Sequence, residues 1–264
     1  MRDTGIEDMV TVGEMSSTTL DNCIRYSRPE DRELSMCFNF HHLKVDYRDG
    51  DKWKLTEPDL VRLKQLFMEW QEGMERENGW NAVFWCNHDQ PRAISRFGDD
   101  GRYWKESAKM LATVIHMFRG TPYVYQGEEL GMTNPALRGI FPQYRDVESI
   151  NYYRILTEQG ITGEEALKVL AARSRDNGRT PMQWDGSDMP DFHRGRPWIG
   201  IPENHSYINA QAEAADSVSI LNYYKRLIAL RKEYKVISEG EIEFIYREHP
   251  QVLAYRRTYQ VRNL

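Results

Sequence analysis

The sequence has few cysteines and no long apolar run, and both shortages narrow the class of protein. Its three cysteines, Cys23, Cys37 and Cys86, are an odd number without CxxC spacing. We therefore expect buried thiols in a reducing compartment rather than disulfides or metal ligands. No stretch approaches the roughly 18 apolar residues that span a bilayer, and residues 1–8 are charged and lack a signal-peptide core. These features predict a soluble cytoplasmic protein with no membrane partner.

Long basic runs are also missing, and the charges are nearly balanced. Lys and Arg number 35 against 40 Asp and Glu, for a net charge of -5, which argues against a general nucleic-acid binder. The chain has no internal repeat, low-complexity segment, GxGxxG, Walker loop or HExxH motif. With 264 residues and 40% hydrophobic residues, we expect one large domain, or one domain with a small appendage.

Apolar runs that end at polar residues are the most informative pattern present. Residues 9–13 run into Glu14, and residues 82–86 run into the loop that holds Asp89. Two further runs, 34–40 and 123–125, end at His41-His42 and at residues 126–128. A parallel strand that is buried on both faces has a nearly continuous apolar sequence of this kind. In α/β barrels, the residues that follow the carboxyl end of each strand face the active site. Both acids are therefore candidate catalytic residues.

The segments between these runs have the spacing of helices. Apolar residues recur with helical period after Pro58, and residues 103–118 form a second such segment that ends before Gly120. Four strand-loop-helix units in series predict an α/β fold, namely half of a (β/α)8 barrel. Residues 131–201 read as a long functional loop around a helix near 147–173, and residues 217–232 as a last barrel helix. Two strands, 241–246 and 252–259, predict the start of an all-β domain, so we divide the chain into domains 1–235 and 236–264.

Two carboxylates on separate barrel strands suit hydrolysis of an acetal between sugars. That reaction needs a proton for the leaving oxygen and a carboxylate that stabilises the oxocarbenium-like charge. Glu14 is the candidate acid, because a carboxyl group near other carboxylates in a partly dry pocket keeps its proton near neutral pH. The alternative is that Glu14 and Asp89 only cap strands or pair with arginines.

Other polar residues near these strand ends have two interpretations each. His88 and Arg92 flank Asp89, and His41 and His42 suit hydrogen bonds to sugar hydroxyls; a zinc site is the alternative, but metal-ligand spacing is missing. The turn Arg175–Arg179 either closes over substrate or is a surface salt-bridge loop. Lys44 and Lys52 either place positive charge at the pocket rim or are solvated surface residues.

Four long strings resemble a known family. TVGE at Glu14, FWCNHDQPR around Asp89, GTPYVYQGEELGM at 120–132 and RDNGRTPMQW at 175–184 resemble the α-glucosidase branch of glycoside hydrolase family 13, from its fifth barrel strand onward. GEMSSTTLDNC and LSMCFNFHHLKVDY resemble most the subgroup that hydrolyses trehalose 6-phosphate. The resemblance covers at least residues 10–259.

The resemblance implies roles for individual residues. Glu14 matches the general acid/base and Asp89 the auxiliary carboxylate, while His88 adjoins that aspartate and Arg179 borders the sugar pocket. Lys44 is the implied phosphate contact and Lys52 a weaker candidate. The implied reaction converts trehalose 6-phosphate and water into glucose and glucose 6-phosphate. No cofactor is implied, and no metal is assigned, because the family's calcium site lies on loops that are not in this sequence.

One departure from the family pattern bears on activity. The family's nucleophile is an aspartate in a G-x-R-x-D string, and no such string occurs here. A retaining mechanism needs two carboxyl groups about 5 Å apart, and Asp89 has a different role. We therefore expect these 264 residues to be inactive alone and to pair with a missing N-terminal half-barrel, since half a barrel exposes strand edges. The alternatives are an oligo-1,6-glucosidase acting on neutral oligosaccharides and a non-catalytic relative that serves as a binding module.

Overall fold

The computed structural model describes residues 9–135, 144–187 and 197–260, and its centre is a parallel sheet. The strands β1 (Val12–Met15), β2 (Met36–Asn39), β3 (Asn81–Val83) and β4 (Thr121–Pro122) pair in the order β1-β2-β3-β4. Every pair is parallel, with Glu14 beside Phe38, Phe38 beside Ala82 and Ala82 beside Thr121. All carboxyl ends therefore lie along one edge of the sheet, as the strand-loop-helix pattern predicts.

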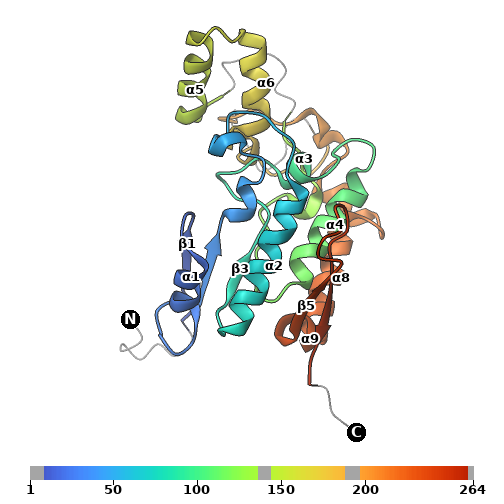
Figure 1. Ribbon diagram of the computed structural model, residues 1–264. Helices are drawn as coiled ribbons and strands as arrows, with labels where there is room; N and C mark the ends of the chain where they lie inside the picture. The colour runs from blue at the N-terminus through green and yellow to red at the C-terminus, as the bar shows by residue number, and fades with distance from the viewer. Residues whose placement is uncertain (1–8, 136–143, 188–196, 261–264) are drawn as a thin grey trace.

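Helices follow each of these strands along the chain (Figure 1). They are α1 (Leu20–Ser27), α2 (Leu60–Arg76), α3 (Ala93–Phe97), α4 (Trp104–Met117) and α8 (Ile220–Glu233). α2 and α4 confirm the helices expected from spacing. α1 was not expected, because Ser and Thr dominate the residues before it; the Thr19 side chain accepts a hydrogen bond from the Asn22 amide and starts the helix as an N-cap.

Two apolar layers hold the helices against the sheet. Leu66, Trp70 and Met74 of α2 pack with Cys23 and Cys37, which are fully buried. A larger cluster joins residues after β3 to α4 and α8: Trp85, Cys86, Leu111, Ala112, Ile115, Ile220, Tyr224 and Leu227. All three cysteines are buried free thiols, as expected.

The region between β4 and α8 contains two helices where one was expected. α5 (Val147–Glu158) and α6 (Gly163–Arg173) lie together at one end of the molecule (Figure 1). The expectation of one helix over 147–173 is wrong, because Gly160 has φ 88 and Thr162 and Glu165 form a capping box that starts a new helix. The short helices η6 (Arg175–Gly178), η7 (Glu203–Ser206) and α7 (Ala210–Ala215) follow.

After α9 (Lys235–Glu239) the chain forms the expected two strands. β5 (Glu241–Ile245) and β6 (Ala254–Thr258) pair antiparallel. Ile242 and Phe244 of β5 pack against Met68 of α2 and against Phe118. Lys64 of α2 is buried, and its ammonium group donates hydrogen bonds to the carbonyl groups of three hairpin residues, Tyr246, His249 and Val252. The hairpin is therefore docked on α2.

The strand boundaries shift slightly from the sequence expectation. β1 starts later and includes Glu14, which lies inside the strand rather than after it. β4 ends at Pro122, before the expected residues 123–125, although the Tyr123 amide still donates to the Val83 carbonyl at 2.8 Å. Among the described residues, no helix is long and apolar enough to cross a membrane.

Candidate active site

Two side chains of the short helix that follows β2 contact the loop that follows β1. The short helix η2 (His41–Lys44) follows β2, and there the Lys44 ammonium group donates to the Ser16 carbonyl at 3.0 Å. His41 Nε2 donates to the Thr18 carbonyl at 2.7 Å. Lys44 therefore contacts the loop that starts two residues after Glu14. The Glu14 side chain is exposed and forms no hydrogen bond or ion pair with the part of the chain that the structure describes.

His42, the next residue of η2, is buried and packs against Phe67 of α2 and against Phe84. Its Nε2 donates to the Phe84 carbonyl at 2.8 Å, and burial lowers the pKa of His42 to about 4. The imidazole is therefore neutral and structural. Within residues 9–135, 144–187 and 197–260, no group of three or more His, Cys, Asp or Glu residues has the arrangement of a metal site.

Asp89 is the centre of a charged cluster. Arg179 Nη2 binds its Oδ1 at 2.7 Å, and Arg175 Nη1 lies 3.5 Å from the same oxygen. His88 Nε2 lies 3.7 Å from Oδ2, and Arg179 Nε donates to the His88 carbonyl at 2.8 Å. The structure thus brings together Asp89, His88 and Arg179, three of the predicted site residues.

The cluster extends to α5 and to Lys52. Arg179 Nη1 lies 3.5 Å from Oδ1 of Asp146, the N-cap residue of α5. Arg175 Nε donates to Glu148 Oε2 at 2.9 Å, and Lys52 Nζ donates to that same oxygen at 2.7 Å. Lys52 is therefore paired with a carboxylate, rather than presenting an unpaired charge at a rim.

Gly178 explains why the Arg175–Arg179 turn lies so close to Asp89. A Cβ atom at this position would be 2.6 Å from the Gln90 carbonyl oxygen and 3.0 Å from that of Asn87. Only a glycine permits this approach. The Tyr125 hydroxyl also donates to the Gly178 carbonyl at 2.9 Å, so the residues after β4 hold the turn from the other side.

A second polar cluster lies deeper and was only partly foreseen. Arg92 is 1% exposed and donates to the Gln126 carbonyl at 2.5 Å, so it supports the loops rather than facing sugar. Glu128 is buried, with Tyr224 and Cys86 donating to its two oxygens at 3.1 and 3.4 Å. Burial raises the pKa of Glu128 to about 7, although these hydrogen bonds lower it. The polar strand end at 126–128 signalled Glu128, whereas no sequence signal pointed to Tyr224.

A buried ion triplet joins the residues after η2 to α3 and α6. Arg96 Nη2 binds Asp46 Oδ1 at 2.6 Å, and Arg173 at the end of α6 binds Oδ2. Burial raises the pKa of Asp46, but the two guanidinium groups outweigh it and hold the pKa below its ordinary value. Sequence reasoning missed this triplet, because its three residues are far apart in the chain.

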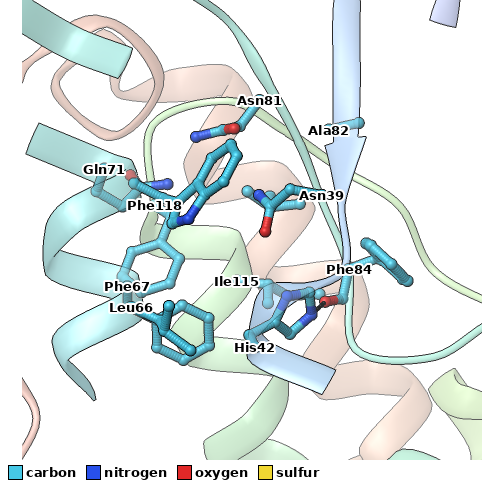
Figure 2. Close-up of a pocket in the computed structure, with 12 residues that line it drawn as sticks. Asn39, His42, Leu66, Phe67, Gln71, Asn81, Ala82, Phe84, Ile115 and Phe118 are labelled. Carbon is cyan, nitrogen blue, oxygen red and sulfur yellow. Dashed lines mark hydrogen bonds between the residues drawn. The ribbon is translucent and has the colours of Figure 1, made fainter. Parts of the chain in front are cut away.

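Glu14 and Asp89 belong to strand ends on one edge of the sheet, separated by one intervening strand. β1 and β3 both flank β2, so these two strands are about 10 Å apart; Glu14 lies within β1, whereas Asp89 lies in the loop after β3. A cavity of about 30 Å³ lies between β2, β3, α2 and α4, lined in part by Asn39, His42 and Asn81 (Figure 2). It has room for water and not for a sugar, and neither candidate carboxylate lines it.

Comparisons with known proteins agree with this arrangement. The family model described as "Alpha amylase, catalytic domain" matches residues 1–240. Trehalose-6-phosphate hydrolase of Bacillus subtilis is 53% identical over 250 residues, covering 95% of this chain and 44% of that protein. Oligo-1,6-glucosidase of Bacillus cereus is 44% identical, covering 97% of this chain and 46% of that protein.

A solved structure shows the same fold. The crystal structure of Bacillus licheniformis trehalose-6-phosphate hydrolase superimposes with a TM-score of 0.94 at 54% identity, covering 97% of this chain and 46% of that one. The chain thus spans about half the length of the relatives it matches. The parallel sheet, the carboxylates at its edge and these matches together show that the chain belongs to the α-amylase family, glycoside hydrolase family 13.

Proposed function

We propose that the chain forms the part of a trehalose-6-phosphate hydrolase that carries the general acid/base and the auxiliary carboxylate. Glu14 protonates the glycosidic oxygen and then activates water, while Asp89 and His88 bind hydroxyl groups of the glucose unit that is cleaved. Arg179 fixes the Asp89 carboxylate and borders the sugar. The observation that carries this proposal is the contact of Arg179 with both Asp89 and the His88 carbonyl at the carboxyl edge of the parallel sheet.

The covalent step needs a carboxylate that these 264 residues do not supply in a G-x-R-x-D string. We propose that β1 to β4 correspond to strands five to eight of a (β/α)8 barrel, and that the nucleophile comes from a half-barrel outside these residues. On this proposal residues 236–264 begin a β domain. Three buried free thiols support a reducing compartment such as the cytoplasm.

The first test measures hydrolysis of trehalose 6-phosphate. We expect no turnover by the purified chain, and turnover after co-expression with the N-terminal part of the Bacillus subtilis relative that precedes the matched region. Glu14→Gln should then abolish activity, because the leaving oxygen loses its proton donor. Turnover by the 264 residues alone, at a rate comparable to an intact hydrolase, would refute the requirement for an outside nucleophile.

The substrate is tested at Lys44, whose ammonium group contacts only the exposed Ser16 carbonyl among the described residues. A flexible ammonium group binds phosphate as a point charge. In the reconstituted enzyme, Lys44→Ala should raise KM for trehalose 6-phosphate about tenfold, the loss of a charge-assisted contact, and should leave hydrolysis of a neutral aryl glucoside unchanged. Equal losses on both substrates would reject the phosphate role of Lys44.

A further inference from the structure

Glu148 occupies a position that neither the catalytic roles nor the resemblance explains. Its Oε2 atom accepts hydrogen bonds from Lys52 Nζ at 2.7 Å and from Arg175 Nε at 2.9 Å. Arg175 in turn lies 3.5 Å from Asp89 Oδ1. One carboxylate oxygen therefore joins the Lys52 loop to the Asp89 cluster, in a chain of alternating charges.

The start of α5 holds Glu148 firmly in this position. The carboxylate of the N-cap residue Asp146 accepts from the Ser149 amide, and Asp176 Oδ2 accepts from the Arg145 and Asp146 amides at 2.7 and 2.9 Å. The Ser149 hydroxyl donates to Ser174 at 2.7 Å. Glu148 lies in the first turn of this anchored helix, so its side chain is presented by a fixed backbone.

The Lys52 side is fixed as well. The Trp53 ring stacks on Tyr152 of α5 with centroids 4.5 Å apart and an interplanar angle of 13°. The Lys52 ammonium group lies 4.6 Å from the centre of the Trp53 ring, and the side chain is 19% exposed. An incoming anion can reach this ammonium group, but it must compete with Glu148 for it.

We propose that Glu148 is a positioning residue that competes with the phosphate group of an anionic sugar for Lys52, and so limits how tightly the site holds such a ligand. This proposal rests on the proposed function for its ligand class. A carboxylate that neutralises Lys52 and Arg175 lowers the positive potential at the site without touching the sugar ring. It therefore affects phosphorylated sugars and leaves neutral ones unaffected.

The test is an NMR titration with glucose 6-phosphate and with glucose, in which every 264-residue variant also carries Val12→Lys to suppress association through the exposed edge of β1. We expect Glu148→Gln to tighten binding of glucose 6-phosphate about fivefold, from the removal of one charge at short range, and to change glucose binding less than twofold. In a Lys52→Met background the same substitution should give less than a twofold gain. Asp49→Asn is the matched control, because it frees Lys54 from an exposed ion pair on the same segment.

Weaker binding of glucose 6-phosphate by Glu148→Gln, or equal changes for both sugars, would overturn the proposal. If glucose 6-phosphate binds to none of the variants, the proposed function is refuted for this chain. The competition between Glu148 and an anion for Lys52 is then tested separately with inorganic phosphate. With ¹³C-dimethylated lysines, which keep their charge, the midpoint of the phosphate-induced shift of the Lys52 signal should lie at an about fivefold lower phosphate concentration in Glu148→Gln than in the wild type. Identical titration midpoints in both proteins would reject competition.

Discussion

At the scale of single residues, the buried acid Glu128 has the clearest consequence. Burial raises the pKa of Glu128 from its ordinary value of 4.5 to about 7. Hydrogen bonds from Tyr224 and Cys86 lower the pKa, but they do not cancel the effect of burial. The folded protein therefore holds this proton more tightly than the unfolded chain. The contribution to stability is fully present below about pH 4.5 and is lost as the pH rises through about 7.

We accordingly expect Glu128→Gln to flatten the pH dependence of stability between pH 5 and pH 8. The shift corresponds to about 3 kcal/mol of unfolding free energy in the wild type, and the amide carries no titrating proton. Urea denaturation at both pH values measures the difference. The exposed Glu164→Gln serves as the control, and a Glu128→Gln protein with the wild-type pH profile would contradict the assignment.

At the scale of elements, the site depends on how closely two loops approach each other. Gly178 allows the Arg175–Arg179 turn to lie against the carbonyl groups of Asn87 and Gln90. Gly178→Ala should force the loops apart, remove the contact between Arg179 and Asp89, and lower the unfolding free energy by about 1 to 3 kcal/mol. Urea denaturation measures this loss. Gly200→Ala, where an added Cβ meets open space, should have little effect, and equal stability of the two variants would argue against a tight approach.

The β5–β6 hairpin supplies a second prediction at this scale. Lys64 contacts three hairpin carbonyl groups, so Lys64→Met removes the hydrogen bonds of a charged donor and should cost about 1 to 3 kcal/mol. Amide hydrogen exchange should accelerate in residues 241–258. The exposed Lys168→Met is the control. Unchanged exchange in the hairpin would show that apolar packing on α2 is enough to hold the hairpin in place.

The division of the chain into domains at residue 235 stays a prediction.

At the scale of the whole molecule, the sheet has two edge strands. Within the described residues, β1 pairs only with β2 and β4 only with β3, and Val12 on β1 is 38% exposed. Unpaired edges promote association. We expect the 264-residue chain studied alone to self-associate at micromolar concentrations, and Val12→Lys to suppress this association. Sedimentation velocity measures it, and a wild-type chain that stays monomeric would contradict the expectation.

Much of the fold was predictable because local patterns determine it. Apolar runs that end in polar residues marked the parallel strands, and helical spacing marked α2 and α4, since both patterns reflect burial of one element against the next. The helix α1 and the division between α5 and α6 were missed, because side-chain caps at Thr19 and Thr162 and the left-handed Gly160 decide them. Caps give weaker sequence signals than periodicity does.

Local sequence patterns were enough to predict the family, the parallel strands with acids near their carboxyl ends, and the candidate residues Glu14, Asp89 and Arg179. The partner of each charged side chain became known only from the folded arrangement of the loops. It joined Arg179 to Asp89, tied Lys52 to Glu148 across 96 positions of sequence, and placed His42 and Arg92 in the interior. The physical reason is that an ion pair or a buried contact depends on distance in space, and residues far apart in the chain come within that distance only when the loops at one sheet edge fold against each other.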